Sequence, residues 1–273
     1  MRVAISNIAW DVHEDEAIGA LLEKYHVDAF DIAPGILFPE PDNATDEDIA
    51  AVKSYWQKKG VEITGMQALL FGTQGLNVFG TQQAQQALLA HLASVCRIAS
   101  KLGARRLVFG SPKNRDRSGL INEEALEVAV SFFRKLGDLA AETDVFFCLE
   151  PNPTCYGANF MVDSHETHQV VRAINHPAIK MQLDTGALTI NKESIQTVLD
   201  EAQNNIGHIH ISEPGLKVVG DEQSDHQAFA AAIHRTFDAP LITIEMVATP
   251  NEPQTDSVKR ALNFVTTTYR NAQ

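Results

Sequence analysis

The stretch Val145-Phe-Phe-Cys-Leu-Glu150-Pro-Asn-Pro153 decides the fold assignment. Its apolar residues follow one another without alternation, which is typical of a strand that is buried on both faces of a sheet. The run ends in a carboxylate, Glu150, and Pro151 then stops the strand. Because a buried carboxylate costs free energy unless a cation or hydrogen-bond donors meet it, Glu150 indicates a candidate functional site.

Seven more strand-like runs alternate with amphipathic stretches along the chain. The predicted strands cover residues 3–5, 29–33, 61–67, 106–110, 145–150, 179–183, 206–211 and 241–246. Helices are expected between them, for example over residues 82–102 and, after the sixth strand, over residues 192–204. Strict alternation of strand and helix is typical of a parallel sheet whose crossovers are helical.

Eight such units in 273 residues predict an α/β fold, a single (β/α)8 TIM-barrel domain over residues 1–273. A Rossmann-type open sheet is the alternative, but no Gly-x-Gly-x-x-Gly fingerprint follows the first strand. No linker rich in proline, glycine or serine divides the chain. A chain of this size buries enough surface to fold without a disulfide or a structural metal.

Charge and cysteine content limit the partners and the compartment. The chain has 22 basic and 35 acidic residues, a formal net charge of −13 at pH 7, so nucleic acid is not expected as a partner. The cysteines, Cys96, Cys148 and Cys155, show no paired spacing, which predicts free thiols and a reducing compartment. Without a signal-peptide pattern or a long apolar run, a cytoplasmic protein without a membrane span is expected.

Polar residues end the last four predicted strands at similar positions. Glu150, Asp184, His210 and Glu245 are separated by 34, 26 and 35 residues, about one strand–helix unit each. The carboxyl ends of barrel strands form one face, so these four side chains are expected to converge. A single acidic residue at a strand end is more often a helix cap or a surface residue, but four in register indicate a common site.

Three carboxylates that lie close together repel one another and raise each other's pKa, and a divalent cation removes this conflict. Three oxygen ligands and one imidazole suit Mn²⁺, Mg²⁺ or Co²⁺, with zinc as a further alternative. We therefore expect one divalent metal ion on these four residues. His208 shares a strand face with His210 but lies one layer deeper, so we interpret it as a hydrogen-bonded core histidine.

Four ordered motifs carry a family resemblance: Leu149-Glu150-Pro-Asn, Leu183-Asp184-Thr-Gly, His208-Ile-His210-Ile-Ser-Glu213-Pro and Thr243-Ile-Glu245. Over the whole chain they resemble the sugar phosphate isomerase/epimerase family with the xylose isomerase-like barrel. The resemblance implies the same four metal ligands and a homo-dimer or homo-tetramer. The ketose epimerases of this family, such as the tagatose and psicose 3-epimerases, carry a histidine where this chain has Ala187, so the substrate contact there differs.

The resemblance implies a metal-dependent isomerase or epimerase of sugars or sugar phosphates in carbohydrate metabolism, with manganese among the candidate metals. Glu150 and Glu245 are the expected catalytic residues. One would remove a proton next to a substrate carbonyl to give a metal-bound enediolate, and the other would return it. Return to the opposite face of the same carbon is epimerisation, and return to the adjacent carbon is aldose–ketose isomerisation.

Six further residues are candidates for substrate binding. They are Trp10, Gln67, Lys113, Arg115, Asn152 and Glu213. Lys113 and Arg115 follow the fourth strand and could hold a phosphate or sugar hydroxyls, although a solvated loop explains them equally well. For the others, packing or hydrogen bonding within the protein is an equal alternative. The long loop over residues 71–80 is interpreted as a lid or a pocket wall.

Three other functions fit parts of the pattern. A dehydratase of a cyclic polyol or inosose would use a similar barrel and the same proton abstraction. An apurinic endonuclease shares the fold in outline, but it needs several zinc ions and more histidines than this chain places at its strand ends. A non-catalytic sugar-binding barrel is the third alternative, and the presence of both glutamates argues against it.

Overall fold

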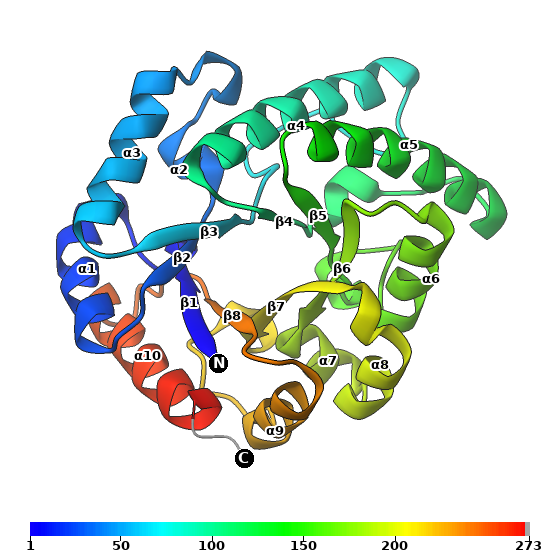
Figure 1. The fold of residues 1–273 in the computed structure, drawn as a ribbon. Helices are drawn as coiled ribbons and strands as arrows, with labels where there is room; N and C mark the ends of the chain where they lie inside the picture. The colour runs from blue at the N-terminus through cyan, green and yellow to red at the C-terminus, as the bar shows by residue number, and fades with distance from the viewer. Residues whose placement is uncertain (271–273) are drawn as a thin grey trace.

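Eight parallel strands pair in chain order, and β8 pairs with β1, so the sheet closes into a barrel. The computed structural model describes residues 1–270, and the last three residues of the predicted domain, 271–273, lie outside this range. The strands are β1 (Arg2–Ser6), β2 (Ala29–Ile32), β3 (Glu62–Met66), β4 (Arg106–Phe109), β5 (Phe146–Leu149), β6 (Ile179–Asp184), β7 (Ile206–Ser212) and β8 (Leu241–Glu245). Figure 1 looks into this ring of strands.

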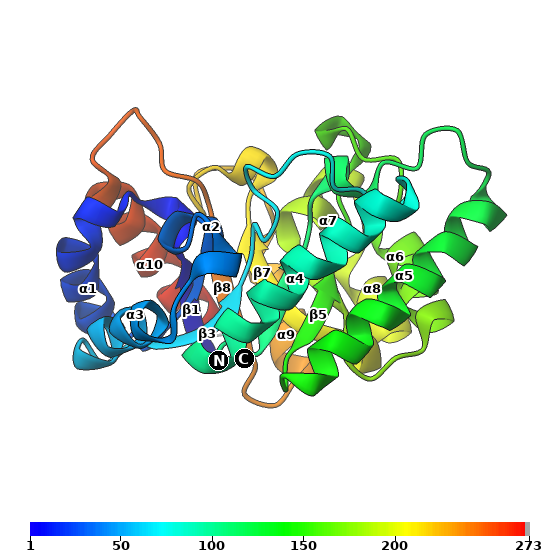
Figure 2. The same ribbon diagram turned by 90° about the horizontal axis from the view of Figure 1, so that it is seen from above.

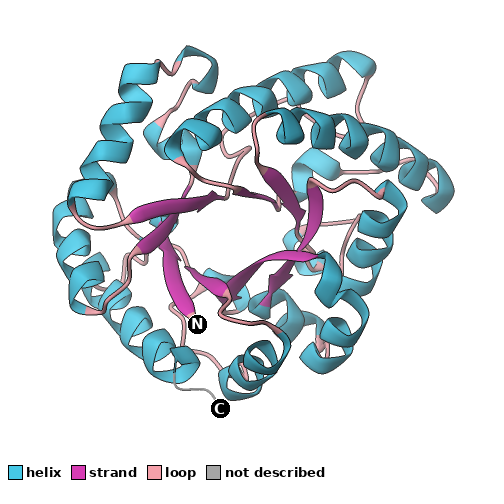
Figure 3. Ribbon diagram, in the orientation of Figure 1, coloured by secondary structure: helices cyan, strands magenta, loops and turns pink. Residues whose placement is uncertain are grey.

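Helices surround the barrel, as the colouring by secondary structure in Figure 3 shows. They are α1 (Asp15–Lys24), α2 (Pro34–Leu37), α3 (Asp46–Lys58), α4 (Gln82–Leu102), α5 (Asn122–Glu142), α6 (Ser164–Ile174), α7 (Thr185–Asn191), α8 (Ile195–Ala202), α9 (His226–Thr236) and α10 (Gln254–Arg270). In Figure 2 both chain ends lie at one end of the barrel, and the loops that follow β3, β7 and β8 lie at the other. The carboxyl ends of the strands therefore share one face.

The helix α4 shows how the sequence forms the outer layer. Its side chains buried against the barrel include Leu88, Leu92, Val95 and Leu102. This spacing places them on one helix face, and burying each such side chain contributes about 1.5–3 kcal/mol. The hydroxyl of Thr81 caps the first turn, and Gly103 ends the helix with a φ of 93°, a conformation that glycine adopts without strain.

The closed sheet confirms the predicted barrel and excludes the open Rossmann-type alternative. The helix predicted over residues 192–204 is confirmed as α8 and a short 3₁₀ helix, Gln203–Asn205, but a further helix, α7, precedes it and was not predicted. Asp184 starts α7, since its Oδ1 accepts a hydrogen bond of 2.6 Å from the amide of Ala187. The helix ends at Asn191, and Lys192 then adopts a positive φ of 56°.

The cysteines are free thiols, as their spacing predicts. Cys96 and Cys148 are buried, and Cys155 is exposed. Within residues 1–270, none of the helices combines the length and the apolar character that crossing a membrane requires.

Candidate metal centre and substrate cavity

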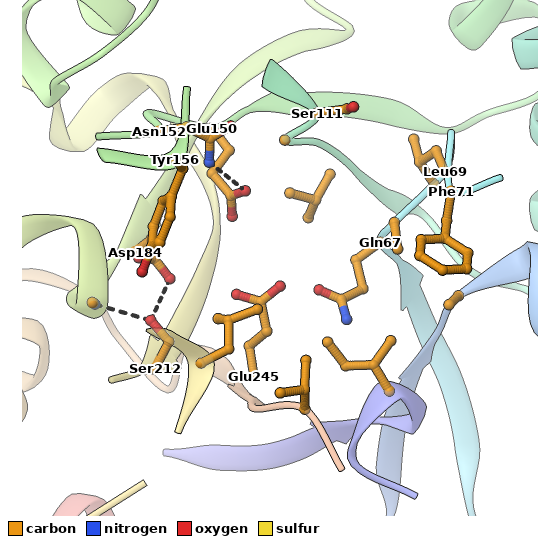
Figure 4. A pocket seen from close by; sticks show the side chains of 18 of the residues that line it. Gln67, Leu69, Phe71, Ser111, Glu150, Asn152, Tyr156, Asp184, Ser212 and Glu245 are labelled. Carbon is orange, nitrogen blue, oxygen red and sulfur yellow. Dashed lines mark hydrogen bonds between the residues drawn. The ribbon is translucent and has the colours of Figure 1, made fainter. Parts of the chain in front are cut away.

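Side chains from the last four strands meet at the mouth of the barrel. Glu150 directly follows β5, Asp184 ends β6, His210 lies in β7 and Glu245 ends β8. One ligand atom of each residue lies within 4.8 Å of the ligand atoms of the other three. Strand register produces this proximity. Asp184 pairs with His210 on β7, and Ser212, which is two residues after His210 on the same strand, pairs with Glu245 on β8. Figure 4 shows the three carboxylates pointing into one cavity.

His210 lies between the two glutamates. Its Nδ1 is 3.2 Å from Oε1 of Glu150 and 3.2 Å from Oε2 of Glu245. Both ring nitrogens of His210 and Oε1 of Glu150 are buried and have no hydrogen-bond partner with suitable geometry among the described residues. Buried polar atoms without partners are uncommon in proteins. A cation held between these side chains would satisfy His210 Nδ1 and Glu150 Oε1.

The charges of the cluster conflict with one another. Burial, together with the charges of Glu150 and Glu245, raises the pKa of Asp184 to about 7. Burial also raises the pKa of Glu245, although His210 opposes this change. Burial alone would lower the pKa of His210, but the two glutamates raise it well above its usual value. Three carboxylates and one imidazole, without a thiolate, fit a divalent cation that prefers oxygen and nitrogen ligands.

Ser212 supports the Asp184 carboxylate, a role that was not predicted from the sequence. The Ser212 hydroxyl donates a hydrogen bond of 2.6 Å to Oδ2 of Asp184 and accepts one of 2.9 Å from the amide of Gly186. A Cβ at Gly186 would lie only 2.6 Å from the Ser212 Oγ, so glycine is required for this approach. Because strand side chains alternate, the position two residues after His210 could have identified Ser212 as a neighbour.

Arg115 and Asn152 hold the Glu150 segment in place. Arg115, in the short 3₁₀ helix Pro112–Arg115, donates hydrogen bonds of 2.7 Å to the Glu150 carbonyl oxygen and to Oδ1 of Asn152. The Asn152 amide in turn donates to Oε2 of Glu150 at 3.3 Å. Gly110 leaves the space that this carboxylate occupies, because a Cβ there would collide with Oε2 of Glu150. The Glu150 side chain is thus fixed from both sides.

The placement of Arg115 corrects the expectation that it binds substrate. Its side chain is only 1% exposed and does not line the cavity. Burial lowers its pKa to about 10, with the charges of Glu150 and Glu166 opposing the change. The guanidinium therefore remains a cation at neutral pH, but its donors face the protein backbone and Asn152.

A cavity of about 670 Å³ lies above the carboxylates. The candidates that line it are Trp10, Gln67, Lys113, Asn152 and Glu213. The Gln67 amide points into the cavity (Figure 4) and donates a hydrogen bond of 2.5 Å to the Ser6 hydroxyl. Trp10 lines the cavity and is also packed into the protein. It is only 3% exposed, and its indole nitrogen donates a hydrogen bond to Asp15. Lys113 is exposed, and its Nζ donates to the Thr73 carbonyl oxygen at 3.2 Å.

The carboxylate of Glu213 is engaged inside the protein. Its Oε1 lies 2.9 Å from Nε2 of His226, and its Oε2 accepts a hydrogen bond of 2.5 Å from the Ser224 hydroxyl. The other ring nitrogen of His226 lies 2.7 Å from the Tyr269 hydroxyl. Glu213 therefore joins the end of β7 to α9 and α10. It also lines the cavity, and its contact with substrate stays a prediction.

A polar network forms the floor beneath the candidate metal site. His208 lies 3.1 Å from Oδ2 of Asp31 and 3.1 Å from the Thr243 hydroxyl. Asp31 accepts hydrogen bonds of 2.8 Å from the hydroxyls of Thr64 and Thr243. His208 is thus the hydrogen-bonded core histidine that its position predicts. Asp31, inside the second strand, was not identified from the sequence.

Aromatic residues fix the loops around the cavity. Phe79 packs edge to face against Phe160, with ring centroids 4.9 Å apart, so it anchors the loop after β3 to the loop after β5. Phe71, on the same loop, lines the cavity and is 80% exposed. The Tyr156 hydroxyl accepts a hydrogen bond of 2.7 Å from the amide of Gly215, which joins the loops after β5 and β7.

The closed barrel and the four converging side chains define a class, namely (β/α)8 barrels with a candidate divalent-metal centre at the carboxyl ends of the last four strands. The chain belongs to the xylose isomerase-like TIM barrel family, whose sequence profile matches residues 20–268. No curated protein matches the chain in sequence.

Solved structures share this fold at low sequence identity. D-psicose 3-epimerase from Clostridium cellulolyticum H10, solved with D-tagatose, has a TM-score of 0.81 and 18% identity, over 98% of this chain and 99% of that one. The 3-keto-D-glucoside 4-epimerase from E. coli has a TM-score of 0.80 and 15% identity, over 98% and 99%. The IOLI protein with a bound zinc atom has a TM-score of 0.77 and 14% identity, over 100% and 99%.

Proposed function

We propose that the protein is a divalent-metal-dependent isomerase or epimerase of sugars that moves a proton on a carbon next to a carbonyl group. The geometry of the two glutamates carries this proposal. Glu150 and Glu245 approach the same nitrogen of His210 at 3.2 Å each, and both line the cavity. Two carboxylates that reach one cavity from different strands can remove a proton and return one.

The residues of the site would bind the metal and transfer the proton in the proposed reaction. Glu150, Asp184, His210 and Glu245 would hold the metal, with Mn²⁺, Mg²⁺, Co²⁺ and Zn²⁺ as candidates. When bound, such a cation polarises a substrate carbonyl and makes the neighbouring C–H more acidic. Figure 4 shows Glu150 and Glu245 entering the cavity from opposite sides. In the proposed reaction the ionised glutamate takes the proton from one face of the carbon, and the protonated one returns a proton.

The cavity walls suit a small polar substrate. Gln67 and Asn152 offer amide groups to sugar hydroxyls, Lys113 offers one cation at the rim, and Trp10 offers an apolar face. A nucleic acid is not proposed as a partner, because the chain carries a net charge of −13. The names of the D-psicose and 3-keto-D-glucoside epimerases among the similar structures support a sugar substrate. A homo-dimer or homo-tetramer remains a prediction that light scattering can check.

Solvent deuterium exchange tests the proposal even when the product has not been identified. Purified protein loaded with Mn²⁺ would be incubated in D₂O with ketohexoses, 3-keto-glucosides and inososes, and the carbons would be followed by NMR. We expect deuterium at the carbon next to the carbonyl of at least one compound, and no exchange after EDTA treatment. The product then separates epimerisation, isomerisation and dehydration. Absence of exchange from every compound class would contradict the proposed function.

A further inference from the structure

The cavity wall is divided by the strands that form it. The loop after β5 and the ends of β6, β7 and β8 contribute the polar residues Glu150, Asn152, Asp184, Ser212 and Glu245. The opposite side, from the β8 loop through β1 and β2 to β3, contributes large apolar side chains. This apolar wall consists of Ile8, Trp10, Ile36, Leu69, Phe71 and Val247. Figure 4 shows Leu69 and Phe71 across the cavity from Asp184 and Tyr156.

Exposed apolar side chains gather at this cavity. Among the described residues, eight large hydrophobic side chains are exposed, and four of these line the cavity. They are Ile36, Phe71 and Val247 of the apolar wall, with exposures of 38%, 80% and 43%, and Tyr156 on the opposite side, with 44%. Exposed apolar groups gathered at one cavity indicate a surface that binds something apolar.

Polar groups of a substrate would find few partners on this side. Among the described residues that line the cavity on the β1 to β3 side, the polar side chains are Asp11 and Gln67. Asp11 already accepts a hydrogen bond of 2.7 Å from the Gln254 amide at the outer surface. Sugar hydroxyls placed against Ile36 and Phe71 would lose water without gaining hydrogen bonds, which costs free energy. A second sugar unit therefore fits this wall poorly.

A phosphate group would fit the cavity poorly as well. Lys113 is the only cation among the described lining residues, whereas five carboxylates line the same cavity. Arg115, the other candidate for a phosphate contact, is buried and engaged with Glu150 and Asn152. Phosphate sites in proteins use several convergent donors or cations, and the lining residues do not provide them.

We propose that the substrate is an unphosphorylated sugar that carries an apolar substituent, such as the aryl or alkyl group of a keto-glycoside, whose keto group supplies the carbonyl that the proposed reaction requires. The sugar lies on Glu150, Asp184 and Glu245, and the substituent lies against Ile36, Leu69 and Phe71. A cavity of about 670 Å³ falls in the range that accommodates drug-sized ligands, so it has room for both parts. This inference rests on the proposed function for the position of the sugar.

Calorimetric titration of the Mn²⁺-loaded protein tests this substrate class. The probes are methyl and phenyl β-D-glucopyranoside, and D-fructose and its 6-phosphate. We expect the phenyl glycoside to bind at least about tenfold more tightly than the methyl glycoside, because the phenyl group buries more apolar area. We expect the phosphate ester to bind no more tightly than the free sugar.

Three variants locate the effect. Phe71→Ala and Ile36→Ala should each lower the phenyl-to-methyl affinity ratio at least about threefold. Ile121→Ala is the matched control, because Ile121 is 62% exposed and lies outside the cavity, and it should leave the ratio unchanged. Equal binding of the two glycosides, or tighter binding of the phosphate ester, would overturn the inference. So would a change of oligomeric state in Phe71→Ala without a change in the ratio.

Deuterium exchange keeps the two proposals distinguishable. Deuterium incorporation into ketoses, together with equal affinities for the two glycosides, would support the proposed function but refute the proposed substrate class. A high phenyl-to-methyl affinity ratio without deuterium incorporation into any compound would support the apolar subsite but refute the proposed proton transfer.

Discussion

Arg115 donates a hydrogen bond of 2.7 Å to the backbone carbonyl oxygen of Glu150, from a position outside the cavity that Glu150 lines. The same nitrogen of Arg115 also lies 2.7 Å from Oδ1 of Asn152, whose amide donates to the Glu150 carboxylate. A buried cation therefore determines where one of the two proposed proton-transfer groups lies. This makes Arg115 a positioning residue, and the relationship can be tested.

We predict that Arg115→Lys lowers kcat for deuterium exchange by about 10- to 100-fold, with a smaller effect on KM, because small displacements of a reacting group are costly. Lysine keeps the charge but cannot reach the backbone and Asn152 in the same planar geometry. Metal content and the melting temperature would be measured in parallel. Arg97→Lys is a matched control, since Arg97 also donates to two backbone carbonyls, those of Pro41 and Ala44, away from the site. Equal kcat values for the wild type and Arg115→Lys would exclude the positioning role.

Ser212→Ala should weaken metal binding. The Ser212 hydroxyl donates to Asp184 and lowers its pKa, so its loss favours the protonated carboxyl, which binds metal poorly. We expect the Mn²⁺ affinity, measured by calorimetry, to fall about tenfold, as is usual for groups that orient metal ligands.

The control for this variant is Ser164→Ala. Ser164 is also buried, but its hydroxyl has no partner among the described residues, and Ser164 neither lines the cavity nor belongs to the candidate metal-binding group. Its replacement should leave Mn²⁺ affinity unchanged. Similar affinity losses in both variants would mean that Ser212 acts through general packing and not through Asp184.

The stability of the metal-free protein should depend on the charge of Asp184. Its pKa of about 7 in the folded protein lies above the value of about 3.9 for an unfolded chain. A raised pKa in the folded state gives a contribution to stability that is complete below the unfolded pKa and is lost as the pH rises through about 7. We therefore expect the Asp184 carboxyl to lower the melting temperature of the EDTA-treated protein as the pH rises from about 5 to about 7.5.

Mn²⁺ should reverse this loss, because the metal replaces protons on its ligands. The increase in melting temperature on adding Mn²⁺ should therefore be larger at about pH 7.5 than at about pH 5.5. Asp184→Asn removes the titrating group, so its metal-free form should show a weaker decline with pH. An increase that is the same at both pH values would contradict the assignment of Asp184 as a ligand.

The barrel could be predicted from the sequence because each strand is short, apolar and followed by a helical pattern. Phe147 and Leu149 are fully buried in β5, as the uninterrupted run around them indicates. The convergence of Glu150 with Asp184 followed from topology alone, since neighbouring strands in a barrel end on one face. The helix α7 was missed because its seven residues are too few to show a helical period.

The positions of Arg115 and Glu213 could not be predicted in the same way. Arg115 lies in a run of charged and polar residues that is typical of a solvated loop, and its burial depends on a carbonyl group 35 residues later. Glu213 follows a strand end like a pocket residue, but His226 and Ser224 reach its carboxylate from a later segment. Such contacts depend on how loops fold against each other, which hydrophobic periodicity does not encode.

The most direct test compares deuterium exchange and metal content in Glu150→Gln and Glu245→Gln. Each variant should lose at least about 100-fold in exchange rate, because the carboxylate that moves the proton is absent. Glu222→Gln is the control, since Glu222 lies on the loop after β7 and pairs with Lys217. We predict that both site variants, with Mn²⁺ bound at saturation, are inactive in exchange while the control is active. Full exchange by either site variant with Mn²⁺ still bound would contradict the proposed roles of the two glutamates.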